Sequence, residues 1–288
     1  MKKIAVINDL SGFGKCSLTA AIPIISVLKA QCCPITTAVL SNQTGYNDYF
    51  CKDLTDELPA VIGKIKKLNP TFDGILTGFI SNPKQGKIIA DFIDYFKKDG
   101  TLVVVDPVMA DDGAVYDCYT DECVNAIKEI TKKADIITPN LTELCILCDD
   151  DFNVVNSLSD NNKLTAVRIM CESLCRKSGR DLKIAVSGIR LSNNMIANAV
   201  YDNDKFDVVR TKAQGGSFSG TGDILSSIII AKCTAGKTLL NAIACAGDFI
   251  GKAIAETISD TNGCYNTADG VHFEKFLAEL GGYTKNEK

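Results

Sequence analysis

Short runs of β-branched and other apolar residues alternate with longer segments of helical spacing along most of this chain, and this alternation limits the possible folds most strongly. Strands that are separated by helices usually pair in parallel, and the helices then cover both faces of the sheet. We therefore expect an α/β protein with a central, mostly parallel β-sheet flanked by α-helices on both faces. The expected strands span residues 3–8, 35–40, 74–77, 101–105, 134–138 and 182–187, and the helices near them span residues 16–30, 58–68 and 83–98.

The last third of the sequence has a different pattern. Residues 196–201 and 206–211 have strand-like composition and are joined by a short polar turn, which predicts a β-hairpin. From Thr221 onward the helical pattern is nearly continuous. No linker, repeat or low-complexity segment divides the 288 residues, a length that one α/β domain can occupy. We expect a single domain over residues 1–288.

Composition and charge exclude two classes of partner. The formal net charge of −4 and the lack of a long Lys/Arg run argue against nucleic-acid binding. The longest apolar run, from Ile224 to Ala231, is too short to cross a membrane. Because the N-terminal Met1-Lys2-Lys3-Ile4 enters a strand-like run without a small-residue cleavage site, we expect no signal peptide and a cytoplasmic protein.

The thirteen cysteines and the one histidine restrict the possible chemistry. The number of cysteines is odd, and spacings such as those of Cys145 with Cys148 and Cys171 with Cys175 are typical of buried helix faces. In a reducing compartment such cysteines act mainly as small apolar side chains. Because His272 is the single histidine, a zinc site and Ser-His-Asp or Cys-His catalysis are disfavoured. We expect His272 to be structural and to lie in a helix-like segment.

Polar residues follow directly after many of the expected strands. In a parallel sheet the carboxyl ends of the strands form one edge, and ligands bind in the crevice beyond it. We therefore expect these residues to meet at a ligand site, although they are far apart in the sequence. They are Asp9, Ser11, Gly12, residues 41–46, Thr77, Gly78, Asp106, Asn140, Glu143, Ser187 and Gly188.

The segment from Gly215 to Asp223 (Gly-Gly-Ser-Phe-Ser-Gly-Thr-Gly-Asp) has the composition of an anion-binding turn at the start of a helix. Free N–H groups at a helix N-terminus attract phosphate, and glycine allows a phosphate oxygen to approach the backbone closely. Asp223 adds a proton acceptor at the same point. These are the groups that phosphoryl transfer to an alcohol requires. The alternative is an ordinary helix N-cap, for which Thr and Asp are suitable residues.

The first polar loop, Ser11-Gly12-Phe13-Gly14-Lys15, is similar to a nucleotide-binding loop but does not match one. Asp9 stands where a P-loop has its first glycine, and Cys16 stands where a P-loop has a hydroxyl residue. The Rossmann pattern fails as well, because Ser17 replaces its third glycine. We therefore expect a loop that contacts the substrate.

Two carboxylates have both a structural and a functional interpretation. Asp106 either ends a strand before Pro107 or holds hydrated Mg²⁺, which takes one or two carboxylates. Glu143 either completes a capping box with Asn140 or lies with it near the metal and the phosphates. Residues 111–116 are expected to form a flexible loop that folds over this site.

Together these motifs resemble the ribokinase-like small-molecule kinases, and most closely the pyridoxal/pyridoxamine kinase branch. The resemblance extends from Ile4 to about Glu256. Four motifs carry it in this order: Ser41-Asn42-Gln43-Thr44-Gly45-Tyr46, Asp106-Pro107-Val108-Met109, Thr138-Pro139-Asn140 with Glu143, and Ser219-Gly220-Thr221-Gly222-Asp223. The resemblance implies a ribokinase-like fold, a homodimer, and ATP-dependent phosphorylation of the 5′-hydroxymethyl group of pyridoxal, pyridoxamine or pyridoxine. It also implies Mg²⁺ and leaves a monovalent cation such as K⁺ open.

The resemblance further implies a role for each matching residue. Asp223 would take the proton from the substrate hydroxyl group, while Gly220, Thr221 and Gly222 would form the anion hole for the transferred phosphate. The residues implied to organise Mg²⁺ are Asp106 and Glu143, and those near the nucleotide phosphates are Asn140, Glu143, Ser187 and Thr221. The residues implied to line the pyridine-ring pocket are Ser11, Leu40, Thr44 and Phe79.

Two departures from the pyridoxal kinase pattern leave the acceptor open. Gln43 stands where many of these kinases have His, and Phe79 stands where they have Tyr. A hydroxymethylpyrimidine kinase of thiamine synthesis has the same fold and also phosphorylates a heteroaromatic hydroxymethyl group, so it is the nearest alternative. A sugar kinase, a non-catalytic vitamer-binding protein on this fold and a P-loop NTPase are less favoured, the second because Asp223 and the glycine turn are retained.

Overall fold

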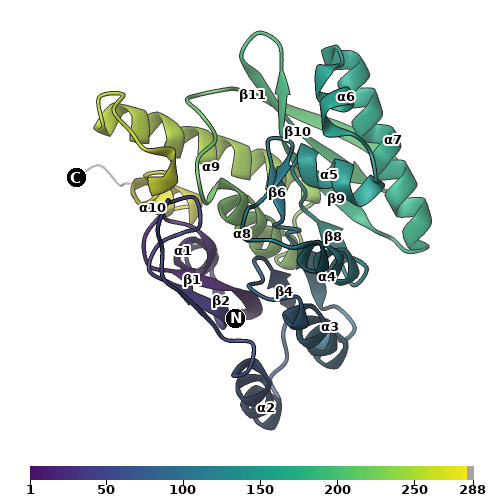
Figure 1. Ribbon diagram of the computed structural model, residues 1–288, viewed down its shortest axis with the longest axis vertical. Helices are drawn as coiled ribbons and strands as arrows, with labels where there is room; N and C mark the ends of the chain where they lie inside the picture. Colours follow the sequence, from purple (N-terminus) through teal and green to yellow (C-terminus); the bar gives the residue numbers. More distant parts are fainter. Residues whose placement is uncertain (284–288) are drawn as a thin grey trace.

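A nine-stranded sheet forms the centre of the protein in the computed structural model, which describes residues 1–283 (Figure 1). The strand order is β11-β10-β9-β8-β5-β4-β1-β2-β3. The strands are β1 (Lys2–Ser11), β2 (Ala30–Leu40), β3 (Cys51–Asp53), β4 (Gly74–Thr77), β5 (Leu102–Val105), β8 (Ile136–Ile137), β9 (Lys183–Leu191), β10 (Met195–Asp202) and β11 (Lys205–Lys212). Strands β2, β1, β4, β5, β8 and β9 pair in parallel, whereas β3, β10 and β11 run antiparallel to their neighbours. The expected mostly parallel sheet is confirmed.

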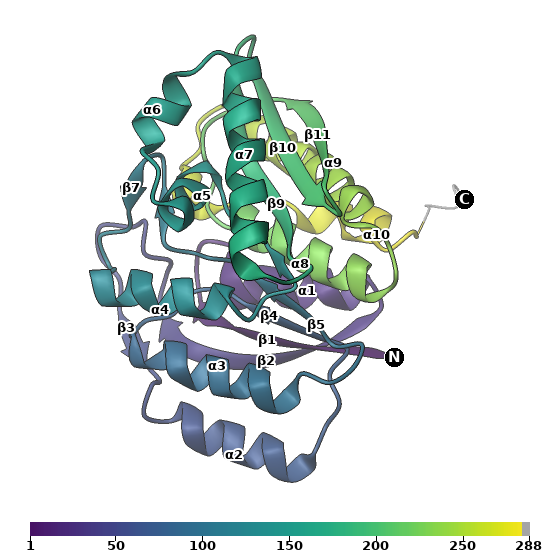
Figure 2. The same cartoon turned by 90° about the vertical axis from the view of Figure 1, so that its right-hand side faces the viewer.

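Helices cover both faces of this sheet (Figure 2). Successive side chains of a strand point to opposite faces. Along β1, Ile4 and Val6 accordingly pack into one apolar core, and Ala5 and Ile7 pack into the other. The first core lies under α1 (Ser17–Val27), α8 (Thr221–Thr234), α9 (Leu239–Asp260) and α10 (Leu277–Leu280). The second lies under α2 (Leu58–Leu68), α3 (Lys84–Phe96), α4 (Asp121–Thr131), α5 (Leu141–Cys148), α6 (Phe152–Ser157) and α7 (Asp160–Ser178).

The direction of the chain reverses at the centre of the sheet, between β1 and β4. The chain leaves β1 through α1 toward β2, and it leaves β4 through α3 toward β5 on the other side. Helices α1 and α3 also lie on opposite faces. Such a reversal opens a crevice at the carboxyl ends of the two central strands. The fold therefore places the residues after β1 and β4 at a site that suits a ligand.

Some predicted elements differ from the observed ones. The first helix was expected to reach Ala30 but ends at Val27, because Lys29 has a left-handed φ of 66° and Ala30 already pairs with Lys2. The helix-like segment expected around His272 is also wrong. His272 lies in an irregular stretch, where its backbone N–H donates to Thr257 Oγ1 at 2.7 Å.

Several elements lie in segments for which the sequence pattern predicted no helix or strand, namely β3, α4, α6 and α7.

The thirteen cysteines are all free thiols, so no disulfide constrains the chain. Within residues 1–283, no helix combines the length and the apolar character that a membrane crossing requires.

Candidate active site

The glycine-rich segment forms a tight turn into the N-terminus of α8. Gly220 is the N-cap residue with φ of 77°, and a Cβ atom there would lie only 2.2 Å from the Lys15 carbonyl oxygen. Only glycine fits such a position without strain. The first bond of the helix joins the Ile224 N–H to the Gly220 carbonyl oxygen at 2.9 Å. The N–H groups of Thr221, Gly222 and Asp223 therefore have no partner within the helix and form a positive end that can bind an anion.

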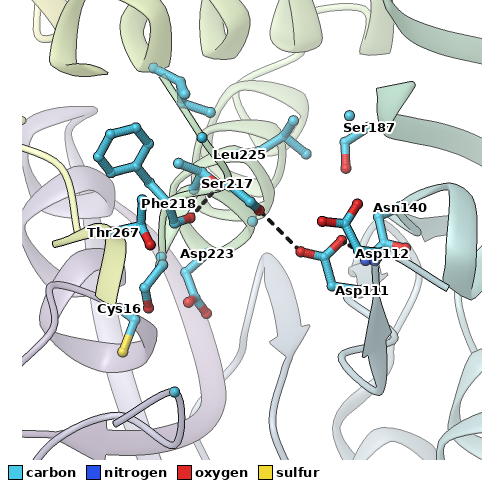
Figure 3. Close-up of a pocket in the computed structure, with 18 of the residues that line it drawn as sticks. Cys16, Asp111, Asp112, Asn140, Ser187, Ser217, Phe218, Asp223, Leu225 and Thr267 are labelled. Carbon is cyan, nitrogen blue, oxygen red and sulfur yellow. Dashed lines mark hydrogen bonds between the residues drawn. The ribbon is translucent and has the colours of Figure 1, made fainter. Parts of the chain in front are cut away.

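Asp223 lies in the first turn of α8, where its carboxyl group faces the pocket (Figure 3). Its side chain is partly accessible, but protein surrounds it on the other sides. This desolvation raises the pKa of Asp223 to about 6, and the neighbouring Asp9 adds to the effect. The Ser17 backbone N–H and the Asn8 side chain act in the opposite direction, because they stabilise the ionised form. The group therefore titrates close to neutral pH, as a general base should.

Asp106 and Glu143 come from different elements but interact electrostatically. Asp106 follows β5 and is buried, and Glu143 is buried in the first turn of α5. Burial, followed by the charge of Asp223, raises the pKa of Asp106 to about 8. Burial, followed by the charge of Asp106, raises the pKa of Glu143 well above its usual value. Asp106 thus lies within the electrostatic influence of both Asp223 and Glu143, and a cation bound at Asp106 would be favourable.

Glu143 also has the structural role that its spacing allowed. The Glu143 N–H donates to Asn140 Oδ1 at 2.9 Å, and the Asn140 N–H donates to Glu143 Oε2 at 2.9 Å, so the capping box is present. Glu143 Oε1 accepts the Met109 N–H at 3.0 Å, and the Asn140 side-chain amide donates to the Ala110 carbonyl oxygen at 2.7 Å. Glu143 therefore fixes the chain that follows Asp106.

The residues around Asp106 fit Mg²⁺ rather than a fully protein-bound metal. In the part of the chain that the structure describes, no three His, Cys, Asp or Glu side chains converge to hold a metal. Mg²⁺ does not need them, since it keeps several waters and binds one or two carboxylates together with substrate phosphates. Thr138, next to Asp106 at the ends of the paired strands β5 and β8, has a buried hydroxyl oxygen without a hydrogen-bond partner among residues 1–283. Asp106 can bind the ion directly, and Glu143 can act through water.

The opposite wall of the site is formed by residues after β1, β2 and β4. Phe79 stacks on Tyr119 with ring centroids 5.5 Å apart, and its carbonyl oxygen accepts from Thr37 Oγ1 at 3.0 Å, so the ring position is fixed. The Ser11 hydroxyl group donates to Asp9 Oδ2 at 2.7 Å. The hydroxyl proton of Ser11 is therefore already donated to Asp9, so Ser11 can offer a ligand only a hydrogen-bond acceptor. Lys15 does not face a phosphate, because its Nζ pairs with Glu274 at 2.9 Å.

Asn140 follows β8 and Ser187 lies in the middle of β9, and the two are side by side in an isolated parallel bridge. Figure 3 shows them opposite Asp223 and Cys16, across the pocket. The Ser187 N–H donates to the Pro139 carbonyl oxygen at 2.9 Å. The two residues that the resemblance placed near the nucleotide phosphates are therefore neighbours in space.

Residues 111–116, expected as a flexible loop, belong instead to a short hairpin of β6 (Ala110–Asp111) and β7 (Ala114–Val115). The hairpin is linked to both sides of the site. Ser217 Oγ donates to Asp111 Oδ2 at 3.1 Å (Figure 3). Arg190 pairs with Asp112 at 3.2 Å. Asp111 and Asp112 line the pocket, and they do so as part of this hairpin rather than of a flexible loop.

One cavity of about 1160 Å³ connects all these groups. Ligand pockets commonly measure about 300–1,000 Å³, so this one has room for a nucleotide and a small acceptor together. Every predicted site residue lines it, namely Ser11, Leu40, Thr44, Phe79, Asp106, Asn140, Glu143, Ser187, Gly220, Thr221, Gly222 and Asp223.

The lining also contains residues to which the sequence assigned no role. Arg190 and Lys212 are its only Lys or Arg residues among those that the structure describes, and they come from β9 and β11. Asp9, which the sequence placed at the ligand edge without a specific role, is buried beside Ser11 in the last part of β1. Carboxylates outnumber these cations: they are Asp9, Asp106, Asp111, Asp112, Asp117, Glu143 and Asp223. A cation bound with a polyphosphate would offset this excess of acidic side chains.

Comparison with known proteins identifies relatives of this chain. The phosphomethylpyrimidine kinase family matches residues 18–268. The hydroxymethylpyrimidine/phosphomethylpyrimidine kinase of Aquifex aeolicus is 31% identical over 183 residues, which span 63% of this chain and 66% of that protein. The pyridoxal kinase PdxY of Aliivibrio fischeri is 23% identical over 96% of both chains.

A solved structure is similar over almost the whole chain. It is a candidate phosphomethylpyrimidine kinase of Bacteroides thetaiotaomicron, in a crystal form with pyridoxal. The two proteins are 34% identical with a TM-score of 0.89, and the match covers 97% of this chain and 95% of the other. The central sheet flanked by helices is therefore ribokinase-like, as expected.

Proposed function

Because the chain belongs to the phosphomethylpyrimidine kinase family, we propose that it transfers the γ-phosphate of ATP to the 5′-hydroxymethyl group of pyridoxal, pyridoxamine or pyridoxine. One observation carries the chemistry. Asp223 lies in the helix turn whose free N–H groups face a cavity that also contains Asp106. A base, an anion site and a carboxylate for a cation are the parts that phosphoryl transfer needs.

In the proposed reaction, Asp223 accepts the proton of the substrate hydroxyl group as its oxygen forms a bond to the γ-phosphorus. The bond from that phosphorus to the bridging oxygen of ADP breaks, and ADP leaves with the electron pair. The N–H groups of Thr221 and Gly222 stabilise the charge on the phosphoryl oxygens, while Asn140 and Ser187 orient the nucleotide phosphates. Bound Mg²⁺, held by Asp106 and through water by Glu143, would neutralise part of the polyphosphate charge.

The identity of the acceptor is the finer part of the proposal. Support for a B6 vitamer comes from the Ser41 to Tyr46 motif and from the similar Bacteroides protein, whose crystal form contains pyridoxal. Hydroxymethylpyrimidine is the second candidate, and the family match and the Aquifex relative favour it. Four further parts of the proposal rest on sequence or resemblance. They are a single domain over residues 1–288, a homodimer, a cytoplasmic location and a monovalent cation such as K⁺.

Incubation with Mg·ATP and each acceptor separately, with the products identified by mass, tests this proposal. We expect a 5′-phosphate from at least one B6 vitamer, with a higher kcat/KM than for hydroxymethylpyrimidine. Product from hydroxymethylpyrimidine alone would assign the second function, and no product from any acceptor would contradict both.

Hydroxymethylpyrimidine phosphate is expected to react poorly in the same assay. The acceptor end of the lining offers Asp9 and Asp223 but no Lys or Arg among residues 1–283 to meet a second phosphate.

The pH dependence of turnover tests the state of Asp223. Its folded pKa of about 6 lies above the ordinary value of 3.8, and only the ionised carboxylate can accept a proton. We therefore expect kcat to fall as the pH drops through about 6, by roughly tenfold per pH unit below it. A kcat that is constant from about pH 8 down to about pH 5 would show that no such base is needed.

A further inference from the structure

Asn8 was not among the predicted site residues, yet it connects the two halves of the site. It lies near the carboxyl end of β1, at the reversal between β1 and β4, and the residue is only 4% exposed. Its Nδ2 donates to Asp223 Oδ1 at 3.0 Å. Its Oδ1 accepts the Phe79 N–H at 2.8 Å and the Asp9 N–H at 3.0 Å.

These contacts determine which way the amide points. A backbone N–H is always a donor, so the atom that meets the N–H groups of Phe79 and Asp9 must be the oxygen. The NH₂ group then faces Asp223, which can only accept when it is ionised. The neighbouring chain adds a steric limit, because a Cβ atom on Gly78 would lie 2.6 Å from Asn8 Nδ2. The side chain therefore has one orientation, with a donor toward the carboxylate.

The contact with Asp223 matters because an aspartate carboxylate has no strongly preferred rotation about its terminal bond. The terminal torsion of an aspartate is broad, so hydrogen bonds decide where its oxygens point. A hydrogen bond to a charged group is also stronger than one between neutral groups, and it favours the ionised form. Asn8 is 215 positions from Asp223 in the sequence, so this bond also joins α8 to the centre of the sheet.

We propose that Asn8 is a positioning residue, which orients the Asp223 carboxylate toward the acceptor hydroxyl group and couples it to the ring pocket through the Phe79 backbone. The inference rests on the proposed role of Asp223 as the base. Asn8 itself touches no reacting atom. Its effect should therefore appear in turnover, with little change in the binding of either substrate.

The Asn8→Asp variant separates this role from simple packing. It has the same shape and can still accept the N–H groups of Phe79 and Asp9, but it replaces the donor toward Asp223 with a carboxyl oxygen. If the new carboxyl group is ionised, its charge raises the pKa of Asp223, so a larger fraction of the base is already protonated near neutral pH. If the two groups share a proton, that proton occupies the base. In both cases the donor that orients Asp223 is lost. We expect kcat to fall about 10²-fold, as small misplacements of catalytic groups can cause, while KM for ATP and for the acceptor stays within about threefold.

A second comparison uses the Asp223→Asn background. If Asn8 acts only through Asp223, adding Asn8→Asp to Asp223→Asn should lower kcat by less than about twofold further, because residues that act as a unit are not additive. If kcat of the double variant instead falls by the product of the two single-variant losses, Asn8 has a general structural effect and the inference is overturned. Thr257→Val is the matched control, since Thr257 is buried outside the pocket and its Oγ1 accepts from the His272 N–H. It should lower the melting temperature without changing kcat.

A substrate-independent measurement keeps this inference separable from the proposed function. Crystal structures of the wild type and of Asn8→Ala should show the Asp223 carboxylate rotated in the variant. A carboxylate that keeps its orientation would contradict the positioning role, whichever acceptor the protein uses. An unchanged kcat in Asn8→Asp would contradict it as well. If the wild type phosphorylates no acceptor, the proposed function fails, and the crystal structures alone decide whether Asn8 orients Asp223.

Discussion

Asp223→Asn is expected to lower kcat by about 10²–10⁴-fold, the loss that follows removal of a general base, while ATP binding stays close to that of the wild type. Asparagine has the same shape, and its Oδ1 can still accept from the Asn8 side-chain amide, but it cannot accept the hydroxyl proton. The free N–H groups of Thr221 and Gly222 are unchanged in this variant, so the anion site remains. Turnover and calorimetric titration of ATP on the same preparation measure the two effects separately.

The same variant should also be more stable than the wild type at pH 8 when no metal or ligand is bound. The folded pKa of Asp223 is about 6 and its ordinary value is 3.8, so the ionised group destabilises the fold, and stability falls as the pH rises from about 4 through about 6. Asp73→Asn is a matched control. Asp73 accepts from Lys2 Nζ at 2.8 Å and from the Lys3 N–H at 2.9 Å, at the amino end of β1. The Asp73→Asn variant should be less stable than the wild type and have the same kcat. Wild-type turnover in Asp223→Asn would show that Asp223 is not the base.

The strands that could be predicted are those with a continuous apolar pattern. Residues 74–77 and 101–105 were located to within one residue because these strands are covered on both faces, so their residues form a nearly continuous apolar run. The two-residue strands β6 and β7 have no such pattern. They are held by contacts of Asp111 with Ser217 and of Asp112 with Arg190, which are distant in sequence. Local pattern reasoning therefore predicted a loop there.

Part of the candidate site could also be predicted, where a local spacing or the order of the strands indicated it. The capping box of Asn140 and Glu143 depends on a three-residue spacing, so the sequence alone indicated it. The parallel strands bring their carboxyl ends to one edge, which predicted that Asp106, Asn140 and Ser187 would meet. Asn8 had no such signal. A buried asparagine in a strand is unremarkable until the fold brings Asp223 to it, and that contact depends on the packing of α8 against the sheet.

Removal of divalent metal is expected to abolish turnover, and Asp106→Asn is expected to lower kcat/KM for Mg·ATP by about 10²–10³-fold. The reason is the charge of the lining, in which the carboxylates far outnumber Arg190 and Lys212. The polyphosphate would therefore meet repulsion unless a cation is bound beside Asp106. Initial rates with excess EDTA and then with restored Mg²⁺ measure the first effect. Kinetics of the variant over a range of Mg²⁺ concentrations measure the second.

Stability provides a test of the same site that needs no substrate. The folded pKa of Asp106 is about 8, above the ordinary 3.8, so metal-free stability should decrease as the pH rises from about 4 through about 8. At pH 8, Mg²⁺ should raise the melting temperature of the wild type, because a ligand that binds only the folded state stabilises it. Asp106→Asn should melt higher than the wild type without Mg²⁺ and respond little to the ion. An equal Mg²⁺ response in both proteins would place the metal elsewhere. Glu143→Gln is unsuitable for this comparison, because an amide cannot accept from both the Met109 and Asn140 N–H groups.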